Sequence, residues 1–192
     1  ECCSEVGFAL YDMYAYNEKH NEANGWNNTD GANDNNSWNC GAEGETDQPD
    51  VLALRDRMRK NAMAVLFCSR GAVMFLAGDE FGNTQYGNNN PYCQDNEISW
   101  LDWGRLEQYR DLHDFTAGMI AFRKKHPVLR DHMLPARCGW LDVSFHHGTA
   151  WNGQVHDYTR QIGILFAGQQ EDGKDDCVML CINTHWEDHE QE

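Results

Sequence analysis

The stretch that decides the fold is PDVLALRDRMRKNAMAVLFCSRGAVMFLAGDE, which runs from Pro49 to Glu80. Its first part predicts a helix, because proline stands in the first turn and apolar side chains recur every three or four residues, at Val51, Leu54, Met58, Ala62 and Leu66. Gly71 marks the end of that helix, and the apolar run 72–77 has the pattern of a strand buried on both faces. A helix that leads directly into such a strand predicts an α/β fold, with functional groups on the loop after the strand.

Two long loops lie on either side of this stretch. Residues 17–39, NEKHNEANGWNNTDGANDNNSWN, hold nine asparagines and no apolar periodicity, and Trp26 and Trp38 favour an ordered binding loop over disorder. Residues 78–103, GDEFGNTQYGNNNPYCQDNEISWLDW, are again dense in carboxylates, amides and aromatic rings. Carboxylates and amides hydrogen-bond to hydroxyl groups, and aromatic faces stack on pyranose rings, so the loops are suited to sugar. A merely solvated face is the alternative, and the composition leaves both interpretations open.

The remaining chain changes character near Arg130. Residues 105–126 predict a second helix that turns Leu112, Phe115, Met119 and Phe122 inward and ends in a basic run. Three short strand-like runs follow, at residues 141–145, 161–168 and 176–183, with no further helix between them. The sequence therefore predicts an α/β part followed by an all-β module.

Composition limits the partners. The 192 residues carry a net charge of −16, which disfavours nucleic acid because phosphate is repelled. No run approaches the roughly 18 to 20 apolar residues of a membrane span, and residues 1–5 do not resemble a signal peptide, so we expect no membrane anchor. The eight cysteines form no CxxC pair, which favours free thiols over a disulfide that joins Cys177 to Cys181.

Several motifs resemble, in order, the C-terminal part of bacterial glycogen-debranching enzymes and isoamylases of the α-amylase family. They are YNEKHNEANGWNNTDG, NDNNSWNCGAEG, the whole 78–103 loop, SFHHGTAW and NTHWEDHE. The resemblance implies a (β/α)₈ barrel followed by a β-sandwich, which hydrolyses α-1,6 branch linkages of glycogen or amylopectin with retention. Residues 1–130 would be the C-terminal part of the barrel, from the seventh-strand loop to the eighth helix, and residues 131–192 an incomplete sandwich.

The catalytic carboxylates expected from the resemblance do not appear in this sequence. A retaining glycosidase needs two carboxyl groups about 5 to 5.5 Å apart, and the family places both on earlier barrel strands. The family's third acidic residue, in a His-Asp-Gly-Phe motif, falls on Glu5-Val6-Gly7-Phe8, so Val6 occupies the aspartate position. Glu5 is one residue out of register and is expected to be an ordinary surface residue. Both ends of the chain therefore look cut.

Sugar contact is expected from the two loops. Asp79 and Glu80 directly follow the predicted strand, where barrel enzymes place functional groups, although loop capping explains them equally well. The residues expected to contact substrate are Trp26, Asn28, Asp30, Asp79, Glu80, Asn88, Asn89, Asn90, Tyr92 and Asp95.

A metal site has weak support. His185, Glu187 and His189 alternate and could bind zinc from one strand face, but an exposed polar face has the same pattern, and the resemblance calls for no metal or cofactor.

The main hypothesis is a piece of a cytoplasmic debranching enzyme that binds α-glucan (glycogen, amylopectin or branched maltooligosaccharides) without cleaving it. A non-catalytic glucan-binding or orphan protein is the rival, and a pullulanase-type relative is the runner-up specificity. Self-association through uncovered barrel surfaces is a further expectation.

Overall fold

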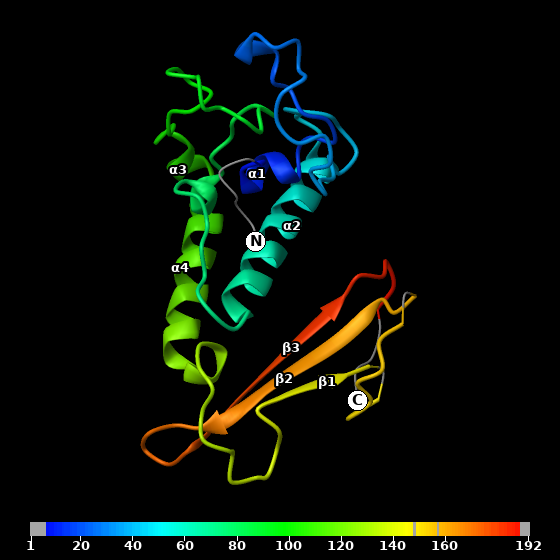
Figure 1. The fold of residues 1–192 in the computed structure, drawn as a ribbon, viewed down its shortest axis with the longest axis vertical. Helices are drawn as coiled ribbons and strands as arrows, with labels where there is room; N and C mark the ends of the chain where they lie inside the picture. Colours follow the sequence, from blue (N-terminus) through cyan, green and yellow to red (C-terminus); the bar gives the residue numbers. More distant parts are fainter. Residues whose placement is uncertain (1–6, 148, 157, 189–192) are drawn as a thin grey trace. The chain divides into compact units, whose positions relative to one another are not determined.

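The chain folds into two compact units. The structure, a computed structural model, describes residues 7–147, 149–156 and 158–188. The first unit comprises Glu1–Leu66 and Val73–Met119, and the second comprises Phe67–Ala72 and Ile120–Glu192. Among the helices of these described residues, none is long and apolar enough to cross a membrane. Figure 1 shows the helices and the three-stranded sheet.

Helices of very different length and long loops build the first unit. The predicted helix from Pro49 is confirmed as α2, and the second predicted helix begins as α3 and continues as α4. The helical elements are α1 (Leu10–Met13), η1 (Glu22–Asn24), α2 (Pro49–Cys68), η2 (Asp79–Phe81), α3 (Arg105–Gln108) and α4 (Arg110–Lys125). Phe8, Tyr11, Ala15 and Tyr16 form a small buried cluster, against which Tyr109 packs.

The most deeply buried side chains of α2 recur every four positions, at Val51, Arg55, Arg59, Met63 and Phe67. The apolar side chains from Leu54 to Leu66 that indicated the helix are half-buried beside them. Two of the most deeply buried residues are arginines, which an apolar pattern cannot reveal. The Arg59 guanidinium lies over the rings of Tyr11 and Tyr109, 5.0 and 4.9 Å from their centroids, and these aromatic faces compensate in part for its lost hydration.

The apolar run 72–77 is not a buried strand, which corrects the sequence prediction. Its residues pair with no strand among those that the structure describes. Met74 is 70% exposed and Leu76 is 39% exposed. The segment Phe8–Met13, which could have paired with this run as a parallel strand, is largely the helix α1, Leu10–Met13. A parallel strand exists only through hydrogen bonds to neighbouring strands, so this sequence pattern alone cannot form one. Self-association through the exposed run stays a prediction.

The second unit contains the predicted antiparallel strands. The three runs are confirmed as β1 (Val143–His146), β2 (Gln161–Gln169) and β3 (Asp175–Asn183), and β2 lies between the other two (Figure 1). Val143 pairs with Phe166, and Gln161 pairs with Asn183. β3 alternates strictly between inward and exposed side chains, as expected for a sheet with one covered face. The short helix η3 (Pro127–Leu129) supplies Val128 and Leu129, both fully buried.

Two smaller expectations meet mixed outcomes. Leu112 of α4 is buried as predicted, whereas Phe122 is 37% exposed and does not turn inward. Cys177 and Cys181 are both exposed free thiols on β3, so the alternative of a bridge between them is not realised; the other described cysteines are also free, at Cys40, Cys68, Cys93 and Cys138.

Candidate functional site: an asparagine-rich loop pair

A reciprocal amide pair joins the two asparagine-rich loops. The Asn21 side chain donates from Nδ2 to Oδ1 of Asn89 at 2.8 Å, and the Asn89 backbone N–H donates to Oδ1 of Asn21 at 3.0 Å. Both side chains are fully buried. Asn89 Nδ2 then donates to the carbonyl of Ala32 and to Oδ1 of Asn35. Loops that are 68 residues apart in sequence are therefore held together by neutral amides.

A second layer of amides extends this contact. Asn88 donates from Nδ2 to Oδ1 of Asn24 at 3.0 Å, and Gln94 donates to the same oxygen at 2.7 Å. Asn24 and Asn90 both donate to Oδ2 of Asp30, at 2.8 and 3.0 Å. These contacts lower the pKa of Asp30, the bond from Asn24 being the largest cause. We call Asn21, Asn24, Asn88, Asn89 and Asn90 the asparagine clamp.

The backbone beside the clamp is shaped to fit it. Gly31 has φ +72°, and a Cβ atom there would lie 2.6 Å from Asn21 Nδ2 and would also collide with Asn89 Oδ1. A residue with a side chain would therefore push the clamp apart. Lys19, itself buried, donates from Nζ to the Asp30 carbonyl at 2.7 Å. Asn28 accepts from the Asn21 N–H at 2.8 Å and donates to the Lys19 carbonyl at 2.9 Å.

Exposed aromatic side chains lie on the outside of the same loops. Trp26 is 59% exposed and Tyr92 is 68% exposed, and the Trp26 indole N–H donates to the Tyr92 hydroxyl at 3.0 Å. On the second loop, the Trp100 indole N–H donates to the exposed Asp95 at 3.0 Å. Trp103 stacks on Phe81, with ring centroids 5.3 Å apart. These rings are available to a ligand, whereas the clamp amides beneath them are occupied.

Asp79 and Glu80 hold the start of the second loop. Asp79 is 1% exposed, and its carboxylate accepts the N–H groups of Leu10 at 2.9 Å and Leu76 at 3.1 Å. Glu80 accepts the N–H of Gly78 at 2.9 Å. These are capping contacts of the kind considered for both residues from the sequence. Sugar contact by Asp79 and Glu80 stays a prediction.

The predicted residues thus separate into three groups. One contains Asn28, Asp30, Asn88, Asn89 and Asn90, which the structure brings together in a single network. Another pairs Trp26 with Tyr92 at the exposed edge, and the last holds residues with separate local contacts, Asp79, Glu80 and Asp95. Asn21 and Asn24 belong to the network but were not singled out. The signal for them was the excess of amides in both loops, which does not tell a buried amide from an exposed one.

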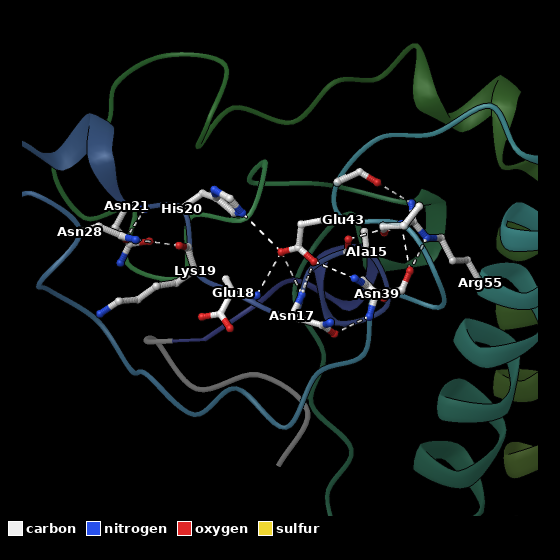
Figure 2. A network of polar contacts seen from close by, with 12 residues as sticks. Ala15, Asn17, Glu18, Lys19, His20, Asn21, Asn28, Asn39, Glu43 and Arg55 are labelled. Carbon is white, nitrogen blue, oxygen red and sulfur yellow. Dashed lines mark hydrogen bonds and ion pairs between the residues drawn. The ribbon is translucent and has the colours of Figure 1, made fainter.

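A polar hub around Glu43 holds the first loop (Figure 2). The Glu43 carboxylate accepts the N–H groups of Asn17 and Glu18 and the Asn39 side-chain amide, and it pairs with His20 Nε2 at 3.4 Å. Burial acts to raise the pKa of Glu43, but these donors outweigh it and the pKa is lowered. Glu43 is therefore a fixed anion that orders residues 17–20.

Arg55 fixes the other side of this hub. Its guanidinium reaches from α2 and donates to the carbonyls of Gly44 at 2.8 Å, Asn39 at 3.1 Å and Ala15 at 3.3 Å, and also to Ala42. The side chain is 1% exposed. One cation thus satisfies carbonyls that no helix or strand could pair.

Asp12 is a buried carboxyl group beneath the second loop. It accepts the Thr84 hydroxyl on Oδ1 and the Gln85 N–H on Oδ2, the latter at 2.7 Å. Burial raises the pKa of Asp12 to about 7, although these hydrogen bonds and Arg105 act to lower it. A carboxyl group that titrates near neutrality is a candidate functional group. The hydrogen-bond donors to Asp12 include the Gln85 backbone and the Thr84 hydroxyl, which favours a structural role.

The remaining sequence hypotheses lie partly outside the described residues. Glu5 and Val6, the positions compared with the family's acidic motif, are not among the residues that the structure describes, and neither is His189. The Glu187 N–H donates to His185 Nδ1 at 3.1 Å. Within the described ranges no three metal-binding side chains come together.

Comparison with known proteins finds relatives that match nearly the whole chain. No family model matches the chain. It is 42% identical to the glycogen operon protein GlgX homolog of Mycobacterium tuberculosis over 97% of its length, and 46% identical to the glycogen debranching enzyme of Enterobacter sp. over 94%. It is also 44% identical to the chloroplastic isoamylase 3 of Oryza sativa over 90%. The chain is homologous to glycogen debranching enzymes and isoamylases. The resemblance drawn from the sequence motifs is thereby confirmed.

This chain spans only part of the length of these relatives. It spans 28%, 25% and 23% of the mycobacterial, Enterobacter and rice proteins. Among solved structures, the pullulanase of Bacillus acidopullulyticus matches 92% of the chain with a TM-score of 0.54 at 21% identity, over 17% of that pullulanase. This likeness supports the fold, and it agrees with the α/β class without showing the barrel portion.

Removing the buried amide at Asn89 tests the clamp. We expect Asn89→Ala to lower the free energy of unfolding by about 1–3 kcal/mol, because Asn21 Nδ2 loses one of its two acceptors and the Ala32 carbonyl loses this donor. Urea unfolding of the purified chain measures this. Asn33→Ala is the matched control, since Asn33 is an exposed amide of the same loop, and it should change stability by less than about 0.5 kcal/mol. Equal effects of the two substitutions would contradict the clamp.

The raised pKa of Asp12 predicts a specific pH dependence. The folded protein holds the Asp12 proton up to about pH 7, because burial raises the pKa of this carboxyl group from 3.8 to about 7. Between pH 3.8 and about 7 the folded chain therefore binds one proton more than the unfolded chain. The stabilisation that comes from keeping Asp12 protonated is full below pH 3.8 and is lost as the pH rises towards 7. The wild type should lose on the order of 4 kcal/mol of its free energy of unfolding as the pH rises through this range, and Asp12→Asn should not show this loss. Thr84 can reverse its hydroxyl and accept from the new amide.

The measurement is urea unfolding at intervals between pH 4.5 and 7.5. The free energy of unfolding of the wild type, minus that of Asp12→Asn, should fall steadily as pH rises across this range. For the exposed control Asp47→Asn the same difference should show no such slope. A flat difference would mean that Asp12 ionises normally in the folded chain.

Proposed function

We propose that this chain supplies glucan-cleft loops to a glycoside hydrolase that debranches glycogen or amylopectin at α-1,6 linkages with retention. The observation that carries the proposal is the asparagine clamp, which joins loops 17–39 and 78–103 beneath the exposed pair Trp26 and Tyr92. The homology to debranching enzymes and isoamylases supports the substrate class. Branched maltooligosaccharides are the small ligands that the site would take.

The proposed role is binding and shaping rather than bond cleavage. Retaining hydrolysis requires a nucleophile and a general acid about 5 to 5.5 Å apart. The most deeply buried carboxylates of the first unit, Asp12 and Asp79, each accept backbone N–H groups, which makes them poor candidates for either role. Trp26, Tyr92 and Asp95 are exposed, so they are the residues through which we expect sugar contact.

The wider setting is part of the same proposal. Residues 1–130 would belong to the end of a (β/α)₈ barrel and residues 131–192 to a β-sandwich, in a cytoplasmic pathway. The relatives include a protein of the glycogen operon, and the pullulanase likeness is compatible with this architecture.

Hydrolysis and binding test the proposal separately. The purified chain should release no reducing sugar from pullulan or amylopectin above background, because we infer that the required carboxylate pair lies on earlier barrel strands outside this chain. It should nevertheless bind maltoheptaose, and the binding should quench or shift tryptophan fluorescence. Trp26→Ala combined with Tyr92→Ala should weaken that binding about three- to tenfold, because both stacking surfaces are lost.

Lys125→Ala is the matched control for the binding measurement, because this exposed residue lies at the end of α4 and outside both loops. Unchanged fluorescence up to millimolar maltoheptaose in a folded sample would refute the retained sugar site. Hydrolysis that copurifies with the chain through successive columns would refute its purely binding role.

A further inference from the structure

An exposed pair of tryptophans lies in the second unit, away in sequence from both loops of the proposed site. Trp140 precedes β1 and is 41% exposed, and Trp151 follows β1 and is 53% exposed. Their ring centroids are 6.1 Å apart and the ring planes are inclined by 61°. Exposing two large indole rings side by side to water costs free energy, and such contiguous apolar surface marks a binding site.

The backbone of Trp151 is strained, and a buried histidine holds it in place. Trp151 has φ +63°, a left-handed conformation that bulky side chains rarely adopt. Its N–H donates to Nδ1 of His146 at 2.9 Å, and the two rings lie 4.9 Å apart. His146 is 4% exposed, and its Nε2 lies 2.9 Å from the Ser144 hydroxyl oxygen. Because Nδ1 accepts a hydrogen bond, the ring proton is on Nε2, which donates to Ser144.

This hydrogen bonding identifies His146 as a positioning residue. With its proton directed at Ser144, the imidazole cannot accept the Ser144 proton, so the pair is not a nucleophile and base. What the arrangement does achieve is a fixed, strained tryptophan beside a second one. Such strain persists only where the surrounding contacts impose it, and it concentrates at functional sites.

The chemistry of the pair fits a neutral, curved polyhydroxyl ligand. Indole faces stack on the apolar faces of pyranose rings, and two planes inclined by 61° cannot both lie flat against one planar partner. Successive glucose units of a coiled α-1,4 chain can present inclined faces. The neighbouring Asn152 and Gln154 are exposed and offer amide groups to hydroxyls. The net charge of −16 disfavours anionic ligands.

We propose that Trp140 and Trp151 form a second α-glucan contact, separate from the loop pair and positioned by His146. The inference rests on the proposed function for its ligand class, and it assigns to the SFHHGTAW motif a role in holding a sugar-binding ring. Such a contact would keep a branched polymer attached to the protein while another part of it occupies the loops, because two weak sites on one chain bind a polymer more tightly than one.

Affinity electrophoresis of the whole chain in native gels that contain glycogen tests the inference. Trp140→Ala and Trp151→Gly should each weaken retention by glycogen about two- to tenfold, through loss of one stacking surface. Trp186→Ala is the matched control: Trp186 is an 88% exposed tryptophan of the same unit, stacked on His185, and its removal should leave retention unchanged. Trp26→Ala reports on the loop pair in the same gels.

Glycine at position 151 also separates binding from folding. It adopts a positive φ without strain, so Trp151→Gly should unfold at a higher temperature than Trp151→Ala while both lose affinity for glycogen. If Trp151→Gly does not fold, Trp140→Ala still decides the question, since Trp140 lies outside the strained turn.

The outcomes distinguish this inference from the proposed function. If Trp26→Ala weakens retention and the two unit-two variants do not, the second contact is refuted and the loop site stands. If Trp140→Ala and Trp151→Gly weaken retention and Trp26→Ala does not, the second contact stands and the loop site falls. No retention of the wild-type chain refutes both. Variants that change self-association but not retention would show that the pair packs against protein, which also overturns the inference.

Discussion

The Arg55 guanidinium is the contact on which the order of the first loop depends. Its N–H groups bind carbonyls of Ala15, Asn39, Ala42 and Gly44, which belong to segments with no backbone ladder. Buried carbonyls without partners would each cost about 1–3 kcal/mol, and a planar cation with five donors satisfies several of them at once. The second unit uses the same device. There Arg123 donates to the carbonyls of four residues, Phe67, Ser69, Gly71 and Leu129.

A polar interior of this kind determines what the loops present to solvent. Once Arg55 and Glu43 have fixed the base of the loop, the asparagine clamp can pair neutral amides with one another and with backbone carbonyls. Neutral amides lose less on burial than charges would. The clamp therefore closes the space between the loops without apolar side chains, and the aromatic rings are left outside. Asp12 is the exception, and its raised pKa shows the cost of burying a carboxyl group among loop donors.

Much of the local structure could be predicted, because its causes are local. Proline at the start of α2 and the alternation in β3 act within a few residues, and both elements form where the sequence indicates. The run 72–77 could not be predicted in the same way, because a strand depends on neighbours that no local pattern supplies. The two arginines on the buried face of α2 could not be predicted for a related reason. Arg55 and Arg59 are interior only because they contact carbonyls and tyrosine rings from other parts of the chain.

The candidate site shows the same limit at the level of single side chains. The amide and aromatic composition of both loops indicated sugar chemistry, but Asn28 and Asn89 could have faced either a ligand or one another. An asparagine offers the same donors and acceptors in both situations, so only the fold decides between them. In the described structure the amides of Asn21 and Asn89 are buried in mutual contacts, and the large exposed surfaces are aromatic. Recognition by this chain would therefore depend on ring stacking over a rigid polar base. Such a surface selects the shape and curvature of a neutral polymer rather than its charge.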